Sequence, residues 1–72
     1  MTLDQVSLNQ EVTVLKVVGE RPIKRRIMEL GILPGKMIKV IKTAPLGDPI
    51  EVSIKSSTFS IRKRDAKNII VE

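Results

Sequence analysis

Two short segments hold most of the residues that restrict the backbone of this 72-residue chain. Three of its four glycines and three of its four prolines lie within residues 31–35 and 44–49. Proline fixes its own φ and favours extended geometry in the residue before it, whereas glycine readily adopts positive φ. The two segments therefore predict a helix that ends at a glycine, then a tight turn, and later a stiff loop that leads into a β-hairpin. The residues to which we assign these structural roles are Gly31, Pro34, Gly35, Pro45, Gly47, Asp48 and Pro49.

Alternation of apolar and polar residues predicts five short strands. The first, at residues 11–18, is rich in β-branched residues and carries apolar residues on both faces, which suits a strand that is partly covered on both sides. Val12 and Val14 share one face of this strand, and Thr13, Leu15 and Val17 share the other. The other strands are expected at 36–42, at 50–55, around Phe59 and Ile61 after a turn at Ser56-Ser57, and at 69–71.

A helical period follows the first strand. Ile23, Ile27 and Leu30 recur at the spacing of one helical face, and Pro22 suits the first turn of a helix. We therefore expect a helix over residues 22–30 whose apolar stripe belongs to the core. Three cations near its start oppose the helix dipole, so packing must hold this short helix in place.

The order of these elements indicates a mainly β fold. Residues 64–68 predict one further helical turn before the last strand. Five short antiparallel strands with one short inserted helix are typical of a small, partly open SH3-like barrel. No linker or repeat interrupts the pattern, so residues 1–72 are expected to form a single domain.

The composition excludes several functions. The chain has no cysteine and no histidine, so it lacks disulfides, the commonest metal ligand and the usual general base near neutral pH. We therefore expect no enzyme activity, no bound metal and no cofactor. No apolar run approaches the roughly 20 residues of a membrane span, and the N-terminus does not resemble a leader sequence. These features predict a soluble, cytoplasmic protein.

The chain is basic, with thirteen Lys and Arg against eight Asp and Glu and a net charge of +5. Such a balance favours nucleic acid, anionic lipid or an acidic protein surface as a partner, and it also keeps a small protein soluble. The basic residues cluster only at 24–26 and 62–64, and Phe59 is the single aromatic residue. Base stacking needs several aromatic rings, so no nucleic acid binding of that type is expected. A basic barrel that binds RNA or the ribosome is the alternative interpretation.

Four apolar residues lie in turns or off the apolar stripe of the helix, where a self-contained domain more often places polar side chains. They are Met28, Ile32, Leu33 and Leu46. In a small domain such residues either plug the ends of the barrel or stay exposed, and the sequence leaves both open. Those that stay exposed form a protein-binding patch. Arg25, Arg26 and Lys36 beside them suit a partner with an apolar centre and an acidic rim.

Three blocks of this sequence resemble the FeoA family, ferrous iron transport protein A. The blocks are residues 26–35 (Arg-Ile-Met-Glu-Leu-Gly-Ile-Leu-Pro-Gly), residues 44–49 (Ala-Pro-Leu-Gly-Asp-Pro), and Ser60-Ile61-Arg62-Lys63 with Ala66 and Ile69. The resemblance spans essentially the whole chain and implies a small SH3-like fold with an inserted helix. The chain departs from the family at Ser56-Ser57, where a glycine is usual, and at Ile27, Met28 and Ile32, where leucine is commoner.

The resemblance implies a non-enzymatic, cytoplasmic accessory or regulatory subunit of the bacterial ferrous iron uptake system. Its partner would be FeoB, the membrane permease that carries a GTP-binding domain, and it would act by protein contact rather than by carrying iron. An apolar patch and a short edge strand would serve a homo-oligomer equally well. Similar barrels form the C-terminal domain of metal-dependent iron repressors, but this chain contains no helix-turn-helix, so that relationship is the lesser interpretation. The docking surface expected for an FeoA protein consists of Met28, Leu30, Ile32, Leu33 and Leu46, with Arg25 and Arg26 as rim charges.

Overall fold

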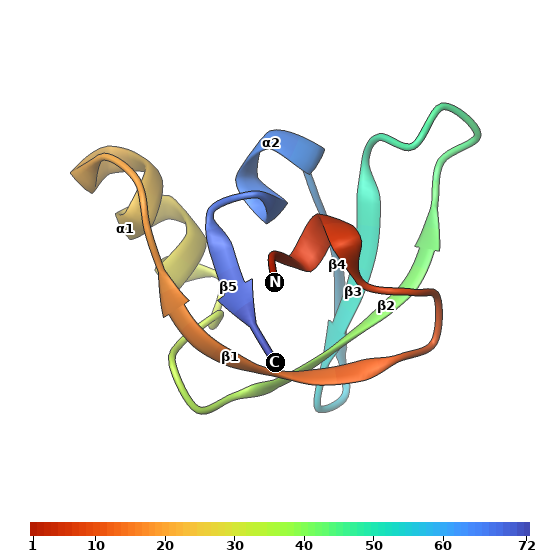
Figure 1. The fold of residues 1–72 in the computed structure, drawn as a ribbon, viewed down its shortest axis with the longest axis horizontal. Coiled ribbons are helices and arrows are strands. Elements are labelled where there is room, and N and C mark those ends of the chain that lie inside the picture. Colours follow the sequence, from red (N-terminus) through yellow and green to blue (C-terminus); the bar gives the residue numbers. More distant parts are fainter.

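Five antiparallel strands form one curved sheet in the order β4-β3-β2-β1-β5 (Figure 1). The computed structural model describes residues 1–72. One helix, α1, is inserted between the first two strands, and a four-residue helix, α2, precedes the last strand. This mainly β architecture confirms the predicted fold class. The elements are β1 (Glu11–Val17), α1 (Arg21–Glu29), β2 (Met37–Thr43), β3 (Ile50–Ile54), β4 (Ser57–Ile61), α2 (Lys63–Ala66) and β5 (Ile69–Val71).

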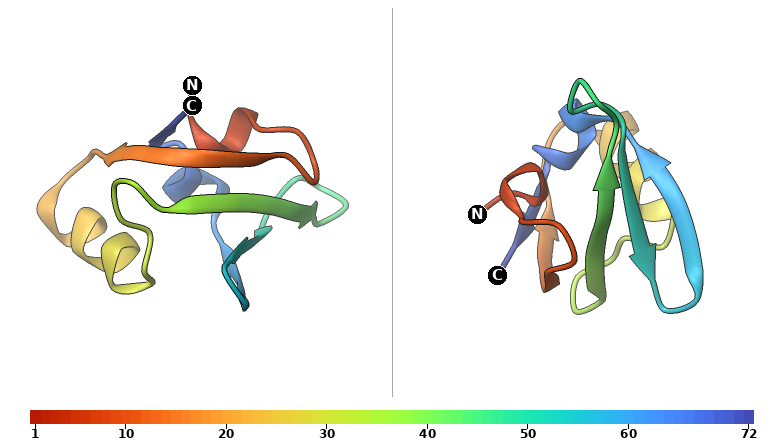
Figure 2. Two further views of the ribbon diagram at one scale, coloured as in Figure 1. Left: turned by 90° about the horizontal axis from the view of Figure 1, so that it is seen from below. Right: turned by 90° about the vertical axis from the view of Figure 1, so that its right-hand side faces the viewer.

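The strand β1 connects two parts of the sheet. Its first half pairs with β2 and its second half with β5, and the register shifts between Val14 and Lys16, which places a β-bulge at Leu15. The bulge bends the strand, and the sheet curls around its core (Figure 2). One extra residue also moves the side chains that follow it to the other face. Val17 is therefore buried, and the prediction that it shares a face with Thr13 and Leu15 is wrong.

The core inside the curled sheet is entirely apolar. All fifteen buried residues are hydrophobic, and no polar or charged side chain is buried. The N-terminal segment contributes Leu3 and Val6, which the alternation of the strands does not predict. A 3₁₀ helix, Leu3–Gln5, positions Leu3, and the Thr2 N–H stabilises it by donating to Gln5 Oε1 at 2.9 Å. The other core residues are Val12, Val14, Val17, Ile27, Ile32, Ile38, Val40, Ile50, Val52, Ile61, Ala66, Ile69 and Val71.

The helix α1 forms largely as its sequence predicts. Pro22 lies in its first turn, and Gly31 follows its end with φ +92°, the left-handed geometry expected there. Within the expected apolar stripe, Ile27 is fully buried and Ile23 packs against the core as a half-buried residue. Leu30 forms the C-cap, beyond the last helical residue, and is 44% exposed. The prediction that Leu30 packs into the core is therefore wrong.

The glycine- and proline-rich segments adopt the predicted turns. Pro34 and Gly35 lie at the centre of a tight turn, in which Gly35 has φ +91°. The β2–β3 loop closes on itself where the N–H of Gly47 donates to the Ala44 carbonyl at 2.7 Å. Pro45 lies between these two residues and restricts the loop further. The tip of this loop is therefore held in a fixed shape although it projects from the sheet.

The turn between β3 and β4 lies one residue earlier than predicted. Ile54 pairs with Ser57, so Lys55 and Ser56 form the two-residue turn instead of Ser56-Ser57. Lys55 has φ +56°, a left-handed conformation that is uncommon outside glycine, asparagine and aspartate. Hairpin turns of this length are usually recognised by glycine or asparagine, and a lysine gives no such signal.

Asp48 bonds to a more distant part of the chain than the sequence predicts. Hydrogen bonds to amides of its own turn are expected, but its Oδ1 accepts a hydrogen bond from the backbone N–H of Lys63 at 2.9 Å. Lys63 is the first residue of α2, so a carboxylate from the β2–β3 loop satisfies an amide that the short helix leaves free. The bond between Asp48 and Pro49 is cis.

Replacing Asp48 by alanine is expected to lower the free energy of unfolding by about 1 kcal/mol, the typical contribution of a helix-capping side chain. The cause is the loss of the acceptor for the Lys63 N–H. Asp48→Asn keeps an oxygen acceptor and should lose less. Urea denaturation of the three proteins, followed by circular dichroism, measures both differences. Equal stability of the wild type and the alanine variant would contradict this capping role.

Candidate functional site

The predicted partner-binding residues of α1 and its C-cap lie on two different flanks. Successive residues are rotated by about 100° around a helix axis. Arg25 and Met28 consequently border a hollow on one flank, whereas Arg26 and Leu30 border a cleft on the other. Met28 and Leu30 therefore border separate recesses, although Arg25 and Arg26 both line a further hollow of about 290 Å³ between the two flanks.

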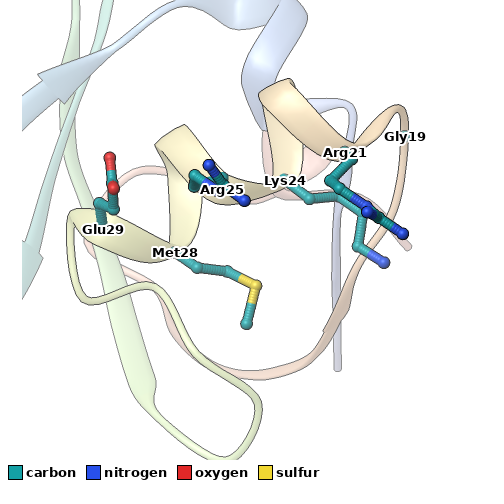
Figure 3. A pocket seen from close by; sticks show the side chains of 6 residues that line it. All are labelled: Gly19, Arg21, Lys24, Arg25, Met28 and Glu29. Carbon is teal, nitrogen blue, oxygen red and sulfur yellow. The ribbon is translucent and has the colours of Figure 1, made fainter.

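The hollow has a volume of about 690 Å³ and is lined mainly by charged side chains (Figure 3). Met28 is its one hydrophobic residue and is half-buried against the core. Arg21, Lys24 and Arg25 contribute positive charges, and none of them takes part in a salt bridge. Their charges are therefore available to a ligand. The complete lining is Gly19, Arg21, Lys24, Arg25, Met28 and Glu29.

This combination of groups suits an acidic protein surface with an apolar centre. The thioether of Met28 can adapt its shape to a side chain of a partner. The surrounding cations attract an acidic partner from a distance and restrict the orientation in which it binds. All three cations are exposed to solvent, where a single ion pair adds little binding energy. The hollow is therefore better suited to a protein than to a small anion.

The cleft on the other flank lies between α1, the end of β4 and α2, and has a volume of about 340 Å³. Ile27 and Ile61, both buried, line it beside the exposed Leu30. Arg26 is not the free rim charge that the sequence predicts, because its Nη2 lies 2.7 Å from Asp65 Oδ1. This salt bridge connects α1 to α2. The complete lining is Arg26, Ile27, Leu30, Ser60, Ile61, Arg62, Arg64 and Asp65.

The remaining predicted contact residues do not join the two flanks into one surface. Ile32 is 0% exposed and fills the core directly after the helix, so its predicted place in a docking surface is wrong. Leu33 is half-buried in the same loop. Leu46 is 96% exposed, but the β2–β3 loop that carries it lies at the opposite end of the molecule from α1 (Figures 1 and 2). The predicted surface is therefore divided into separate regions.

The structure brings together no group of three His, Cys, Asp or Glu side chains that could hold a metal ion. None of its helices has the length and apolar character that crossing a bilayer requires. The charged groups that the structure does bring together are the cations on both flanks of α1.

Comparison with protein families identifies the relationship. The family model described as the FeoA domain matches residues 1–72, which is the whole chain. This chain belongs to the FeoA family. The match confirms the resemblance that rests on the glycine- and proline-rich segments.

Individual FeoA relatives support the assignment. One curated relative is an Fe(2+) transport protein A/Fe(2+) transporter FeoB fusion protein from Porphyromonas gingivalis. The two sequences are 35% identical over 72 residues. These residues are 100% of this chain and only 8% of the fusion protein. The solved structure of an FeoA-like protein from Clostridium acetobutylicum has a TM-score of 0.93 and 38% identity, over 100% of this chain and 84% of the other. Stenotrophomonas maltophilia FeoA, in a crystal structure with zinc, is described as a prokaryotic SH3 domain protein. It has a TM-score of 0.86 and 29% identity, over 100% of this chain and 89% of the other.

Part of a transcriptional repressor shares the fold of this chain. A manganese-dependent transcriptional repressor has a TM-score of 0.85 at 20% identity, over 96% of this chain and 39% of the repressor. At this identity the likeness shows the fold alone. Together with the SH3 description of the Stenotrophomonas protein, it confirms the predicted SH3-like architecture.

The FeoA structure also adds candidate residues that the predicted docking surface does not include. Lys24 lines the hollow, and Arg62 and Arg64 line the cleft. Lys24 precedes Met28 by four positions, the spacing that places two side chains on one helix face, so helical spacing alone could have found it. No comparable signal places Arg62 and Arg64 beside Leu30, because that arrangement depends on how α1 packs against the end of β4.

Proposed function

We propose that this FeoA chain is a non-enzymatic accessory subunit of ferrous iron uptake that acts by contact with an FeoB-type permease. The observation that carries the proposal is the Porphyromonas gingivalis fusion protein, in which an Fe(2+) transport protein A is joined to an Fe(2+) transporter FeoB. Covalent linkage raises the effective concentration of one domain at another to the millimolar range. Such a fusion is most useful where the two parts act on one another. The role suggested for Stenotrophomonas maltophilia FeoA, a ferrous iron transport activating factor, points in the same direction.

The hollow on α1 supports protein contact as the mode of action. It combines one apolar residue, Met28, with unpaired cations such as Arg25, and this pattern suits a partner surface with an apolar centre and an acidic rim. The half-buried Leu33 and the fully projecting Leu46 are further contact points in this proposal. Leu46 would reach a different part of the permease from the hollow, because the two lie at opposite ends of the molecule.

Ferrous iron is the cargo of the permease in this proposal and not a ligand of the FeoA chain. Histidine and cysteine, the soft or borderline ligands for ferrous iron, do not occur in the sequence. The role that follows is regulation or assembly of the permease complex on the cytoplasmic side of the membrane, where its GTP-binding domain would lie. No cofactor and no catalytic residue are part of this proposal.

Uptake of radioactive ferrous iron by cells tests the proposed function. Cells that lack the gene should take up ferrous iron several-fold more slowly than wild-type cells, and the wild-type chain supplied on a plasmid should restore the rate. Met28→Asp places an unpaired charge at the apolar residue of the hollow and should fail to restore it. Leu15→Asp is the matched control, because Leu15 is an exposed leucine on β1 that lines neither surface.

The possible results test the accessory role and the hollow, as its contact surface, independently. An uptake rate that does not depend on the gene would contradict the accessory role. Equal restoration by the Met28 and Leu15 variants would keep the role and exclude the hollow as its contact surface. Circular dichroism of both purified variants establishes that they are folded before uptake is compared.

A further inference from the structure

The two edges of the sheet differ in how the fold covers them. The N-terminal segment covers β5, because Thr2 pairs with Ile70 and the Val71 N–H donates to the Met1 carbonyl at 2.8 Å. β4 pairs only with β3, and no backbone hydrogen bond outside that ladder involves residues 57–61. Figure 2 shows β4 along the outer side of the sheet. β4 therefore presents a free strand edge.

This edge lacks the features by which proteins usually prevent strand addition. Charged side chains, prolines and bulges normally protect free edges. Ser57–Ile61 contains no charged residue and no proline, and its ladder with β3 is regular. Because Ile54 and Ser57 pair directly across the two-residue turn, the amide groups of Thr58 and Ser60 are directed away from β3. These groups can exchange hydrogen bonds with an added strand.

The cleft described above lies directly beside this edge. Its lining includes Ser60 and Ile61 from β4 and Leu30 from the end of α1. Leu30 is 44% exposed there, although it is a large apolar residue. Side chains of an added strand would alternate between the two faces of the sheet, so every second one would face the cleft. The cleft can therefore bind an apolar side chain of a strand that pairs with β4.

The charge around the cleft indicates what else such a strand carries. The cleft is lined by three arginines, Arg26, Arg62 and Arg64, and by one carboxylate, Asp65. Arg26 is already paired with a carboxylate. Arg62 and Arg64 form no salt bridge and donate no side-chain hydrogen bond. Unpaired guanidinium groups are suited to bidentate pairing with carboxylates.

We propose that the free edge of β4 and the adjoining cleft bind an extended, acidic segment of a partner protein. The segment adds to the five-stranded sheet as a further strand, places an apolar side chain against Leu30, and sets carboxylates beside Arg62 and Arg64. This inference rests on the proposed function, because the permease is the protein expected to carry the segment. Pairing of two copies of this chain through the same edge is disfavoured, because it would bring two positively charged regions together.

A peptide fits these observations better than a polyanion does. Lipid headgroups and nucleic acid phosphates require positive charge, but they make no use of a free strand edge or of an apolar cleft. Both features lie beside the unpaired arginines here. The experiment must therefore distinguish binding of an acidic segment from binding of RNA or of an anionic membrane.

The affinity of the purified chain for the detergent-solubilised permease of the same organism tests the inference. The double variant Arg62→Glu/Arg64→Glu should weaken binding at least about tenfold, because it places like charges opposite the acidic segment. The double variant Lys16→Glu/Lys39→Glu is the matched control. It makes the same change in net charge on exposed lysines of β1 and β2, away from the cleft, and should weaken binding less than about twofold.

Hydrogen exchange separates strand addition from attraction between charges. In the complex, the amides of Thr58 and Ser60 should exchange at least about tenfold more slowly than in the free chain. Unchanged exchange at β4, or equal weakening by the two double variants, would overturn the inference while the permease still binds. Failure of the wild type to bind the permease would contradict the proposed function itself. Tighter binding to RNA or to phosphatidylglycerol vesicles than to the permease, dependent on Arg62 and Arg64, would assign the surface to polyanions and overturn the inference.

Discussion

Ile32→Ala is expected to lower the free energy of unfolding by about 2–5 kcal/mol, the range found for truncation of large core side chains. Ile32 is 0% exposed, and its side chain belongs to the single apolar core. The truncation removes this packing and leaves a cavity that the neighbouring residues can fill only in part. A domain of this length is stable by about 4–11 kcal/mol at roughly 0.05–0.15 kcal/mol per residue. The expected loss is therefore a large fraction of the total stability.

Guanidinium denaturation of the variant and of a matched control measures this effect. Leu46→Ala removes the same number of carbon atoms from a side chain that is 96% exposed, and it should change the free energy of unfolding by less than about 0.5 kcal/mol. A similarly small change for Ile32→Ala would contradict its place in the core. It would also be consistent with the predicted position of Ile32 in the docking surface.

Gly19→Ala is expected to lower the free energy of unfolding by about 2–3 kcal/mol, the second-largest effect that we expect. Backbone strain accounts for about 1–2 kcal/mol of this loss, and a steric contact accounts for the rest. Gly19 has φ +109°, and a Cβ at this position would lie 3.3 Å from Asn68 Cγ. Asn68 is held close by because its carbonyl accepts the Val18 N–H at 2.8 Å. Gly19 also lines the hollow and precedes α1, so displacement here would disturb the candidate contact surface as well.

Gly47→Ala separates the two causes of this loss. Gly47 has φ +87°, but a Cβ there would have no heavy atom within 4 Å outside its chain neighbours. Its substitution should therefore show the backbone strain alone, about 1–2 kcal/mol. The further loss in Gly19→Ala measures the contact with Asn68, and Asn68→Ala in the same chain should recover part of it. Thermal unfolding curves of the wild type, the two glycine variants and Gly19→Ala/Asn68→Ala measure these differences in stability. Equal losses for the two glycine variants would show that the contact with Asn68 contributes nothing.

The elements that the sequence predicts well are those marked by residues with few conformations. The end of α1 before Gly31 and the turn at Pro34-Gly35 follow from the backbone requirements of glycine and proline, which hold in any context. The bulge at Leu15 and the turn at Lys55 carry no such marker. Both depend on how neighbouring strands pair over the whole sheet, and a single strand does not contain that information.

The candidate site is less predictable than the fold because exposure is decided by packing between distant elements. Leu30 and Ile32 are apolar residues two positions apart, yet one is 44% exposed and the other is fully buried. Similarly, the basic cluster on the helix does not show that Arg26 is paired with Asp65. The sequence also leaves open whether Leu46 is buried or exposed, and the structure shows it 96% exposed.

A pull-down from detergent-solubilised membranes of the source organism tests most directly the claim that this FeoA chain acts by contact with a ferrous iron permease. Tagged wild-type protein and the Met28→Asp variant are compared, and the retained proteins and nucleic acids are identified. The account predicts that the wild type retains a GTP-binding ferrous iron permease and that the variant retains much less of it. Retention of RNA or ribosomal proteins by both forms, lost at high salt and without the permease, would contradict it.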